Sequence, residues 1–237
     1  EPGTSLDLDQ LSFPAQNPLR RELLSQVVEL CLDEEEALRA LKLGPKGAPE
    51  VQRNREVLSS PVMPALDRYT GVLFDHLDAA SLGAEATQWV RDTLAIGSAL
   101  FGLIRASDPI PAYRLSHDSK VSGGSLAHQW AEVADQAWSE VPGFVLDLRS
   151  EGYRKLAPVP EGTGVFVVLV KEGQVGSRKA LGHANKPVKG ALARELAQSR
   201  ASLDSVEDVV SWGEAHGYFF DLASLREGAI DLVISGS

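Results

Sequence analysis

The chain has 237 residues, of which 43% are hydrophobic and 24% are charged, and its formal net charge is −10. That charge argues against indiscriminate binding to nucleic acid or to an acidic membrane. No apolar run approaches the ~20 residues of a membrane-spanning helix, and the acidic start EPGTSLDLDQ lacks the apolar core of a signal peptide. The single cysteine, Cys31, cannot form an internal disulfide. We therefore expect a cytoplasmic protein with no membrane partner.

The first part of the chain predicts helices. Residues 1–16 contain prolines and a glycine and are expected to form an irregular arm. Apolar residues at helical spacing predict a helix over 18–42, in which the acidic run 33–36 suits the start of a second helix. A proline in the first turn predicts a further helix over 49–58, and a bend then leads into 65–77.

The middle of the chain predicts a helix over 84–104, broken near Gly97 and Gly102. Two short helices joined by such a turn can present backbone N–H groups to a phosphate, and the alternative is a tight contact between packed helices. Ser125 is expected to cap an amphipathic helix over 126–140.

The last part of the chain predicts strands with helices between them. Residues 164–170, GVFVVLV, form the strongest predicted strand. The other predicted strands are 144–146, 175–181, 217–221 and 229–234, and the predicted helices are 185–199 and 204–212. We expect an α+β fold, in which one compact domain over 1–237 has a mixed or antiparallel central sheet flanked by helices.

A charged and hydroxylic cluster follows the strand at 144–146. The sequence continues as Asp147, Arg149, Ser150, Glu151 and Tyr153. A buried strand that ends in such a cluster often builds a binding site. The alternative is that Asp147 and Arg149 simply pair with each other at the edge of the sheet.

Basic residues gather between Lys171 and Arg200. This window holds seven basic and two acidic residues, so it carries a net charge of +5 in an acidic chain. Lys186 and Lys189 flank the predicted start of the helix at 185, and Arg194 follows one to two turns later, an arrangement that favours an anion. The alternative is a solvated helix face.

Two further arginines, Arg68 and Arg114, lie beside Tyr69–Thr70 and Tyr113 and suit a phosphate or a carboxylate. A structural salt bridge explains Arg114 equally well. No phosphate-binding loop of the GxxxxGK[ST] type is present, and the five histidines lack metal-ligand spacing. We therefore expect no metal and no cofactor, although His183 could serve in acid–base chemistry.

Six stretches together resemble the YaaA family of peroxide-stress proteins. They are RYTG at 68–71, GLIRASDPIPAYRL at 102–115, LAHQW at 126–130, LDLRSEGY at 146–153, NKPVKG at 185–190 and GYFFD at 217–221. The resemblance implies a compact α+β fold with a helix-hairpin-helix element, which would lie near 97–102. It also implies DNA binding through a basic cleft and protection against hydrogen peroxide and iron-driven damage. The positions that match are Tyr69, Thr70, Gly71, Gly102, Tyr113, Arg114, Trp130, Ser150, Tyr153, Lys186, Lys189 and Gly190.

The sequence departs from the family pattern in three respects. The apolar strand with which the family normally opens is expected to be missing. Ala99 replaces the first glycine of the hairpin, and the net charge of −10 is unfavourable for duplex binding.

Two hypotheses follow for function. The first is a cytosolic stress-response protein that binds double- or single-stranded DNA. Its anion-binding residues would be Arg68, Tyr69, Thr70, Tyr113, Arg114, Arg149, Lys186, Lys189 and Arg194. The second is an enzyme acting on a nucleotide or another small phosphorylated or anionic substrate in the same cleft. Its proton-transfer groups would be Ser150, Glu151, Tyr153 or His183.

Overall fold

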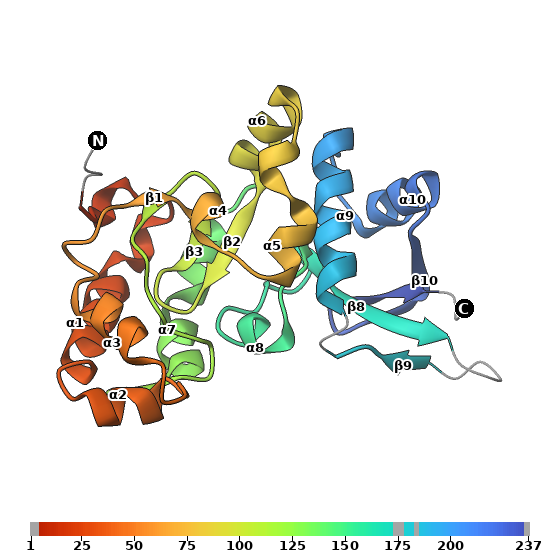
Figure 1. Cartoon of the computed structure of the whole chain (residues 1–237). Coiled ribbons are helices and arrows are strands. Elements are labelled where there is room, and N and C mark those ends of the chain that lie inside the picture. The colour runs from red at the N-terminus through yellow and green to blue at the C-terminus, as the bar shows by residue number, and fades with distance from the viewer. Residues whose placement is uncertain (1–4, 173–177, 183–184, 235–237) are drawn as a thin grey trace. The chain divides into compact units, whose positions relative to one another are not determined.

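The computed structural model describes residues 5–172, 178–182 and 185–234. The chain divides into two compact units. Unit 1 comprises Glu1–Tyr69, Arg91–Val141 and Ser150–Pro158, and unit 2 comprises Thr70–Val90, Pro142–Arg149 and Val159–Ser237. The elements of each unit are labelled in Figure 1. The expectation of one domain over 1–237 stays a prediction.

Unit 1 combines helices with short two-stranded ribbons. Two 3-10 turns, at Leu8–Gln10 and Pro14–Gln16, come first in the chain. The helices of the unit are α1 (Asn17–Leu30), α2 (Glu34–Ala40), α3 (Ala48–Arg55), α4 (Ala65–Arg68), α7 (Leu126–Ser139) and α8 (Glu151–Arg154). Its strands form the antiparallel pairs β1 (Met63–Pro64) with β4 (Pro109–Ile110), β2 (Ala95–Ser98) with β3 (Gly102–Arg105), and β5 (Lys120–Val121) with β6 (Gly124–Ser125).

Capping side chains fix where the helices of unit 1 begin. The Asp33 side chain accepts a hydrogen bond from the N–H of Glu36, and α2 starts there. The predicted N-cap at Ser125 is confirmed, because its hydroxyl accepts the N–H of His128 at the start of α7. Each cap satisfies a backbone donor that has no partner within its helix.

The expected helix over 84–104 is wrong in its second half, and no helix-hairpin-helix element lies at 97–102. Helix α6 (Ala84–Thr93), which begins in unit 2, ends at Thr93, and β2 and β3 then form a β-hairpin with Ser98 opposite Gly102. Residues 98–102 are all buried. Side chains distant in sequence hold this turn, and helical spacing within 84–104 carries no information about them.

Three of those side chains bind the hairpin directly. The fully buried Arg20 donates to the carbonyls of Phe101 at 2.9 Å and Leu103 at 2.7 Å. Trp130 Nε1 donates to the Ala99 carbonyl at 2.9 Å, and the Gln16 carboxamide bonds both the N–H and the carbonyl of Leu103. Burial lowers the pKa of Arg20 to about 10, so it remains a cation at neutral pH.

Unit 2 is built around a five-stranded mixed sheet, as predicted. Strand β8 (Gly164–Glu172) lies between β7 (Val145–Asp147) and β11 (Ala229–Ile234) and is parallel to both. Strand β10 (Phe219–Arg226) is antiparallel to β11, and β9 (Arg178–Ala180) is antiparallel to the end of β8. The residues of β8 from Val165 to Val167, Leu169 and Val170 are buried on both faces of the strand, which explains its continuous apolar sequence.

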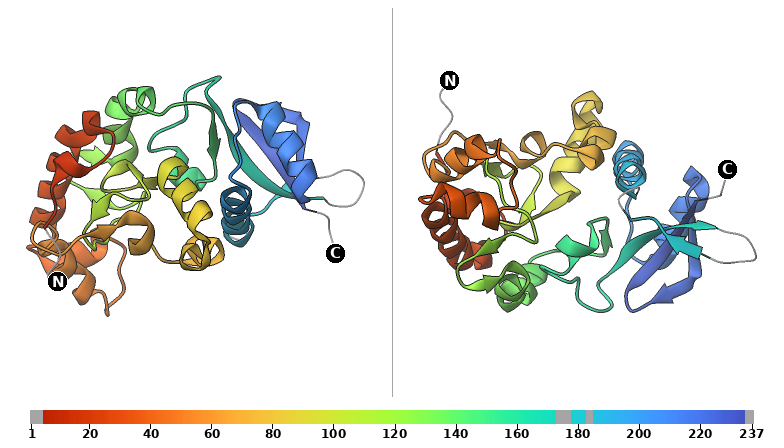
Figure 2. Two further views of the ribbon diagram at one scale, coloured as in Figure 1. Left: turned by 90° about the horizontal axis from the view of Figure 1, so that it is seen from above. Right: turned by 60° about the horizontal axis from the view of Figure 1, so that its bottom comes forward.

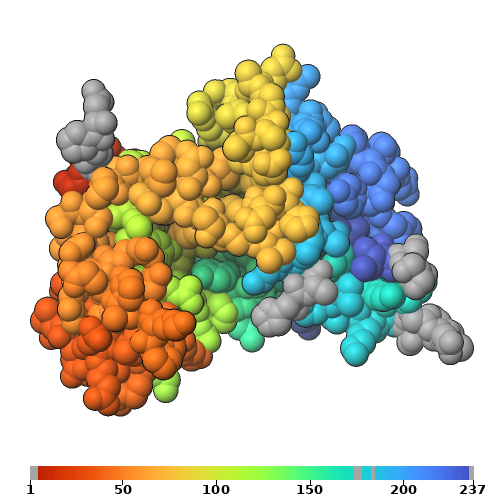
Figure 3. Space-filling view, viewed as in Figure 1, coloured from red at the N-terminus to blue at the C-terminus, as the bar shows by residue number. Residues whose placement is uncertain are grey.

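Helices cover one face of this sheet. Side chains of alternate β8 residues, including Val165 and Val167, pack against Leu192 of α9 (Asn185–Ser199) and Val209 of α10 (Val206–His216). Figure 2 shows α9 beside the sheet in both views. Helix α5 (Val72–Leu77) packs on α9, and the space-filling view shows the segment from 70 to 90 directly against the light blue α9 (Figure 3).

Gly190 is the residue that allows α5 and α9 to come together. A Cβ atom at this position would lie 2.3 Å from the Leu73 carbonyl oxygen and 2.7 Å from His76 Cβ. The glycine in NKPVKG therefore has a packing role.

None of the described helices combines the length and the hydropathy needed to cross a membrane.

Candidate anion-binding site

The predicted site residues are divided between the two units. Unit 1 contains Arg68, Tyr69, Tyr113, Arg114, Ser150, Glu151 and Tyr153. Unit 2 contains Thr70, Arg149, Lys186, Lys189 and Arg194, whereas His183 lies outside the described residues.

In unit 1, the structure brings three hydroxyl groups together as a hydroxyl cluster (Tyr69, Ser98 and Tyr113). The Tyr113 hydroxyl lies 2.7 Å from Ser98 Oγ and 2.7 Å from the Tyr69 hydroxyl. Ser98 is 2% exposed, and both tyrosines are half-buried. The tyrosine ring of Tyr113 also makes edge contacts with Tyr69 and Phe101.

The backbone sets the direction of one of these hydrogen bonds. Ser98 Oγ accepts the N–H of Leu100 at 3.2 Å and the N–H of Phe101 at 2.9 Å. Because both of its lone pairs are then occupied, its hydrogen is available for Tyr113. Either phenol can be the donor of the bond between Tyr113 and Tyr69.

Burial keeps the phenols of this cluster protonated. It raises the pKa of Tyr69 to about 12, partly offset by hydrogen bonds from Ser98 and Tyr113. Burial also raises the pKa of Tyr113 well above its usual value, and the neighbouring Tyr69 and Tyr153 raise it further. At neutral pH the cluster therefore consists of neutral hydrogen-bond donors.

Tyr153 lies near both Tyr113 of the hydroxyl cluster and the cation Arg114. Burial raises its pKa, and the nearby positive charge of Arg114 partly offsets that rise. Its ring meets the ring of His117 edge to face, with centroids 5.2 Å apart. A Cβ atom at residue 152 would lie 2.3 Å from the His117 ring, so Gly152 is what lets these groups meet. Arg114 itself is exposed.

In unit 2, three charged side chains form a buried ionic cluster (Asp147, Arg149 and Lys189). Arg149 donates to both carboxylate oxygens of Asp147, at 2.9 and 2.8 Å, and the side-chain exposures are 14% for Arg149 and 2% for Asp147. Lys189 is 2% exposed, donates to the Arg149 carbonyl at 3.0 Å and lies 4.6 Å from the centre of the Phe166 ring. The pairing of Asp147 with Arg149 that the sequence left open is therefore present.

Arg194 also has structural partners. Its guanidinium donates to the carbonyls of Leu77 at 2.9 Å and Asp78 at 2.8 Å, where α5 ends. A cation at that position satisfies carbonyls that have no partner within the helix. Thr70 and Lys186 are exposed.

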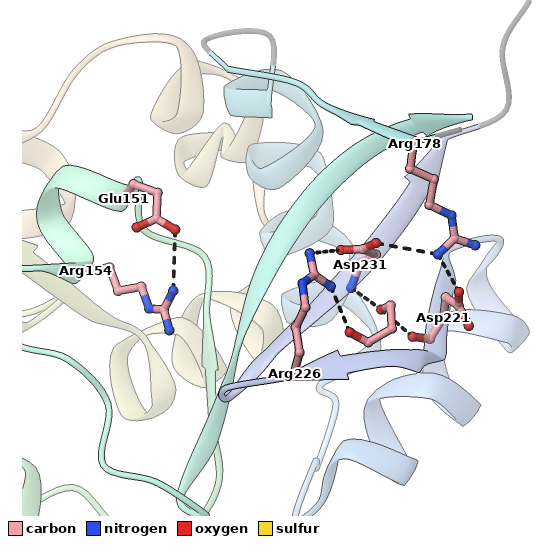
Figure 4. Close-up of polar contacts among 7 residues, drawn as sticks. Glu151, Arg154, Arg178, Asp221, Arg226 and Asp231 are labelled. Atoms are coloured by element: carbon pink, nitrogen blue, oxygen red, sulfur yellow. Dashed lines mark hydrogen bonds and ion pairs between the residues drawn. The ribbon is translucent and has the colours of Figure 1, made fainter. Parts of the chain in front are cut away.

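Opposite charges also pair across strands β9, β10 and β11 of the sheet (Figure 4). Arg178 of β9 contacts Asp221 of β10 and Asp231 of β11, and Arg226 donates to Asp231 at 3.0 Å. The two carboxylates lie directly opposite each other across the strands, and the bond from Arg178 lowers the pKa of Asp221. The arginines relieve a repulsion between like charges.

A different like-charge pair has no such relief. Lys171 and Lys179 are directly opposite in the ladder between β8 and β9, and both are exposed. Among the described residues, no carboxylate forms an ion pair with either lysine or with Lys186. These three lysines are the part of the basic window that remains open to a ligand.

The residues suggested for proton transfer are not arranged as a nucleophile and its base in the described part of the chain. Glu151 forms an ion pair with Arg154 at 3.4 Å, drawn as a dashed line in Figure 4. Ser150 is the N-cap residue of α8 and makes no side-chain cap bond. Within the same described residues, no group of three or more His, Cys, Asp or Glu side chains could hold a metal ion.

Sequence reasoning missed Ser98, because it lies in a short apolar run whose spacing predicted helix. The local signal for it is the adjacent Gly97, which is weak by itself.

These features define a mixed α+β protein that gathers protonated phenols near an exposed arginine. A family model described as "Peroxide stress protein YaaA" matches residues 2–224. A UPF0246 protein of Corynebacterium glutamicum is 40% identical over 98% of this chain and 94% of its own length. Another, from Streptomyces coelicolor, is 36% identical over 95% of this chain and 88% of its own length. The chain belongs to the YaaA family of peroxide stress proteins.

Proposed function

We propose that this protein binds DNA through its phosphate groups as part of the response to peroxide stress. The observation that carries the proposal is the hydroxyl cluster, whose phenols stay protonated near the exposed Arg114. The family description supports the connection with peroxide stress.

Neutral hydroxyls and an arginine complement a phosphate group well. Phosphate oxygens accept hydrogen bonds, and hydroxyl, tyrosine and arginine side chains are common partners of the DNA backbone. The phenols of Tyr69 and Tyr113 are neutral at neutral pH, so a phosphate would meet hydroxyl groups and not phenolate anions. Tyr153 and Arg114 would contact the same anion.

The exposed lysines of unit 2 are proposed as additional phosphate contacts. Lys171 and Lys179 repel each other across the ladder at a cost of roughly 0.2–1 kcal/mol. A bound anion would remove that repulsion. Lys186 adds a third exposed cation, although the net charge of −10 will keep the affinity dependent on low salt.

Fluorescence anisotropy with labelled double- and single-stranded oligonucleotides tests the proposal. We expect binding at ~50 mM salt that weakens steeply by ~200 mM, because neutralised phosphates release counterions. Replacing Lys171 and Lys179 with Gln should lower the salt slope by about 2, roughly one for each lysine. Lys46→Gln is the matched control, since Lys46 is an exposed lysine in a loop of unit 1.

The hydroxyl cluster should respond differently from the lysines. Tyr113→Phe removes a neutral donor, so it should weaken binding equally at every salt concentration. Arg114→Gln should lower both the affinity for DNA and the steepness with which that affinity depends on salt. Undetectable binding at ~50 mM salt, or variants that all behave as Lys46→Gln, would contradict the proposal.

An enzyme acting on a small anionic substrate is a second candidate, favoured by one observation. The aligned hydroxyls from Ser98 through Tyr113 to Tyr69 could relay a proton to or from a bound substrate. A thermal stabilisation screen against mononucleotides separates the two functions. A saturable rise in Tm that Tyr113→Phe abolishes would favour the enzyme.

A further inference from the structure

Unit 1 has an open pocket of about 360 Å³ that contains none of the residues of the hydroxyl cluster. Gln52 and Arg53 of helix α3 and its C-cap residue Glu56 contribute to the lining, and Arg68 and Ala112 approach from elsewhere in the unit. Residues three or four apart on a helix share one face, so these three side chains reach the pocket together.

Arg68 is held in place by backbone carbonyls. Its Nε donates to the Ile110 carbonyl at 3.3 Å, and one terminal nitrogen donates to the Pro61 carbonyl at 3.1 Å. Those two bonds use two of its five N–H groups and fix the plane of the guanidinium. Among the described residues, no carboxylate forms an ion pair with Arg68.

A second guanidinium faces the same space. Arg53 lines the pocket, pairs with Glu50 and keeps 42% of its side chain exposed. Both arginines line the pocket, and the pKa of Arg68 is lowered by burial and further by the positive charge of Arg53. Two guanidiniums sharing one hollow repel each other, and an anion between them would remove that repulsion.

The pocket also contains one carboxylate. Glu56 accepts a hydrogen bond from the Gln52 carboxamide. Its negative charge weakens the field of the arginines and therefore sets a limit on the affinity for an anion.

We propose that this pocket binds the phosphate or carboxylate group of a small molecule, with the guanidiniums of Arg53 and Arg68 as its receptors. A planar guanidinium can donate two parallel hydrogen bonds to either group, so both anions share the same recognition chemistry. A volume of about 360 Å³ suits a small ligand.

The pocket is separate from the hydroxyl cluster but shares backbone with it. Arg68 and Ala112 line the pocket, and the next residues, Tyr69 and Tyr113, carry the clustered hydroxyls.

Titration of the full chain with sodium phosphate and with sodium acetate, at constant ionic strength, tests this site. The readouts are Tm and isothermal titration calorimetry. We expect a saturable stabilisation by at least one of the two anions, following the mass-action dependence on ligand concentration. Saturation by phosphate alone identifies a phosphorylated ligand, by acetate alone a carboxylated one, and by both a receptor for either group.

Four variants test whether each charge in the pocket raises or lowers the affinity for an anion. Arg68→Gln and Arg53→Gln should lower the affinity for the anion at least tenfold, whereas Glu56→Gln should raise that affinity several-fold. Arg21→Gln should change nothing, since Arg21 is 61% exposed and does not line the pocket. Arg53→Gln decides the question if Arg68→Gln fails to fold, because it leaves the carbonyl bonds of Arg68 intact.

Stabilisation that does not saturate, or that is equal in the wild type and all four variants, would overturn the proposal as a general salt effect. The DNA measurements use different residues. Loss of anion binding here with intact DNA binding, or the reverse, would therefore identify which of the two proposals has failed.

Discussion

The hydroxyl cluster of unit 1 joins neutral side chains, whereas the ionic cluster of unit 2 buries charged ones. In the hydroxyl cluster, Ser98 and the two tyrosines satisfy one another without any charge. In the buried ionic cluster, Asp147 is matched by Arg149 on both of its oxygens. The first arrangement can present donors to a ligand with little desolvation cost, whereas the second uses its charges to hold strand β7 and helix α9.

The same contrast shows that basic residues in a sequence are not all available to bind. Within the window from Lys171 to Arg200, three arginines contact carboxylates and Lys189 is buried. The exposed lysines are fewer than the net charge of +5 suggests. An anion is therefore expected to meet isolated lysines in unit 2 and neutral donors in unit 1.

The largest expected effect tests the ionic side of this comparison. Asp147→Asn leaves Arg149 buried without its carboxylate, which should lower the free energy of unfolding by about 3–5 kcal/mol. Glu151→Gln is the matched control, because it removes an exposed carboxylate paired with Arg154 and should cost at most ~1 kcal/mol. Urea unfolding measures both. Equal losses would show that the buried pair contributes no more than a surface pair.

A smaller effect tests the hydroxyl side. Ser98→Ala removes the acceptor of two buried N–H groups, at Leu100 and Phe101, and should cost about 1–3 kcal/mol. Ser139→Ala, which removes an exposed hydroxyl bonded to its own helix, should change stability by less than about 0.5 kcal/mol. If thermal unfolding finds the two variants alike, Ser98 does not organise the turn.

Much of the fold could be predicted from residues close together in sequence. Helix α9 and strand β11 have the predicted bounds, and α7 differs by one residue at its end. These elements have strong apolar periodicity or clear caps, which are local signals. The β-hairpin at 95–105 was predicted as helix because its turn depends on Arg20, Gln16 and Trp130, which are far away in the chain.

The candidate site was less predictable, for a related reason. Tyr69, Tyr113 and Tyr153 were selected from motifs, but nothing local to them indicates Ser98 as their partner. Arg194 looked available because its acceptors, the carbonyls at the end of α5, become partners only after folding. For Arg149, pairing with Asp147 was one of two alternatives, and only the structure decides between them. Residue type could be read from the sequence, whereas whether each charge is already occupied required the structure.

The smallest effect is a pH dependence of the free energy of unfolding, and it should not be detectable near pH ~7. Tyr69 has a pKa of about 12 in the folded protein, and an unfolded tyrosine ionises near ~10. Below pH ~10 both states are protonated, so the stability contributed by this phenol is fully present. Between ~10 and 12 the unfolded chain loses the proton while the folded protein keeps it, so stability falls as pH rises.

Comparing wild type with Tyr69→Phe isolates this contribution, because lysines and other groups that titrate in the same window are common to both proteins. The difference in unfolding free energy between them should stay constant to about pH 9 and shrink as pH approaches 12. Urea unfolding at a series of pH values measures it, and tyrosinate absorbance at each pH confirms which state has ionised. A difference that stays constant through pH 12 would mean that Tyr69 ionises as an ordinary surface phenol, and the contrast between neutral donors in unit 1 and paired charges in unit 2 would lose its physical basis.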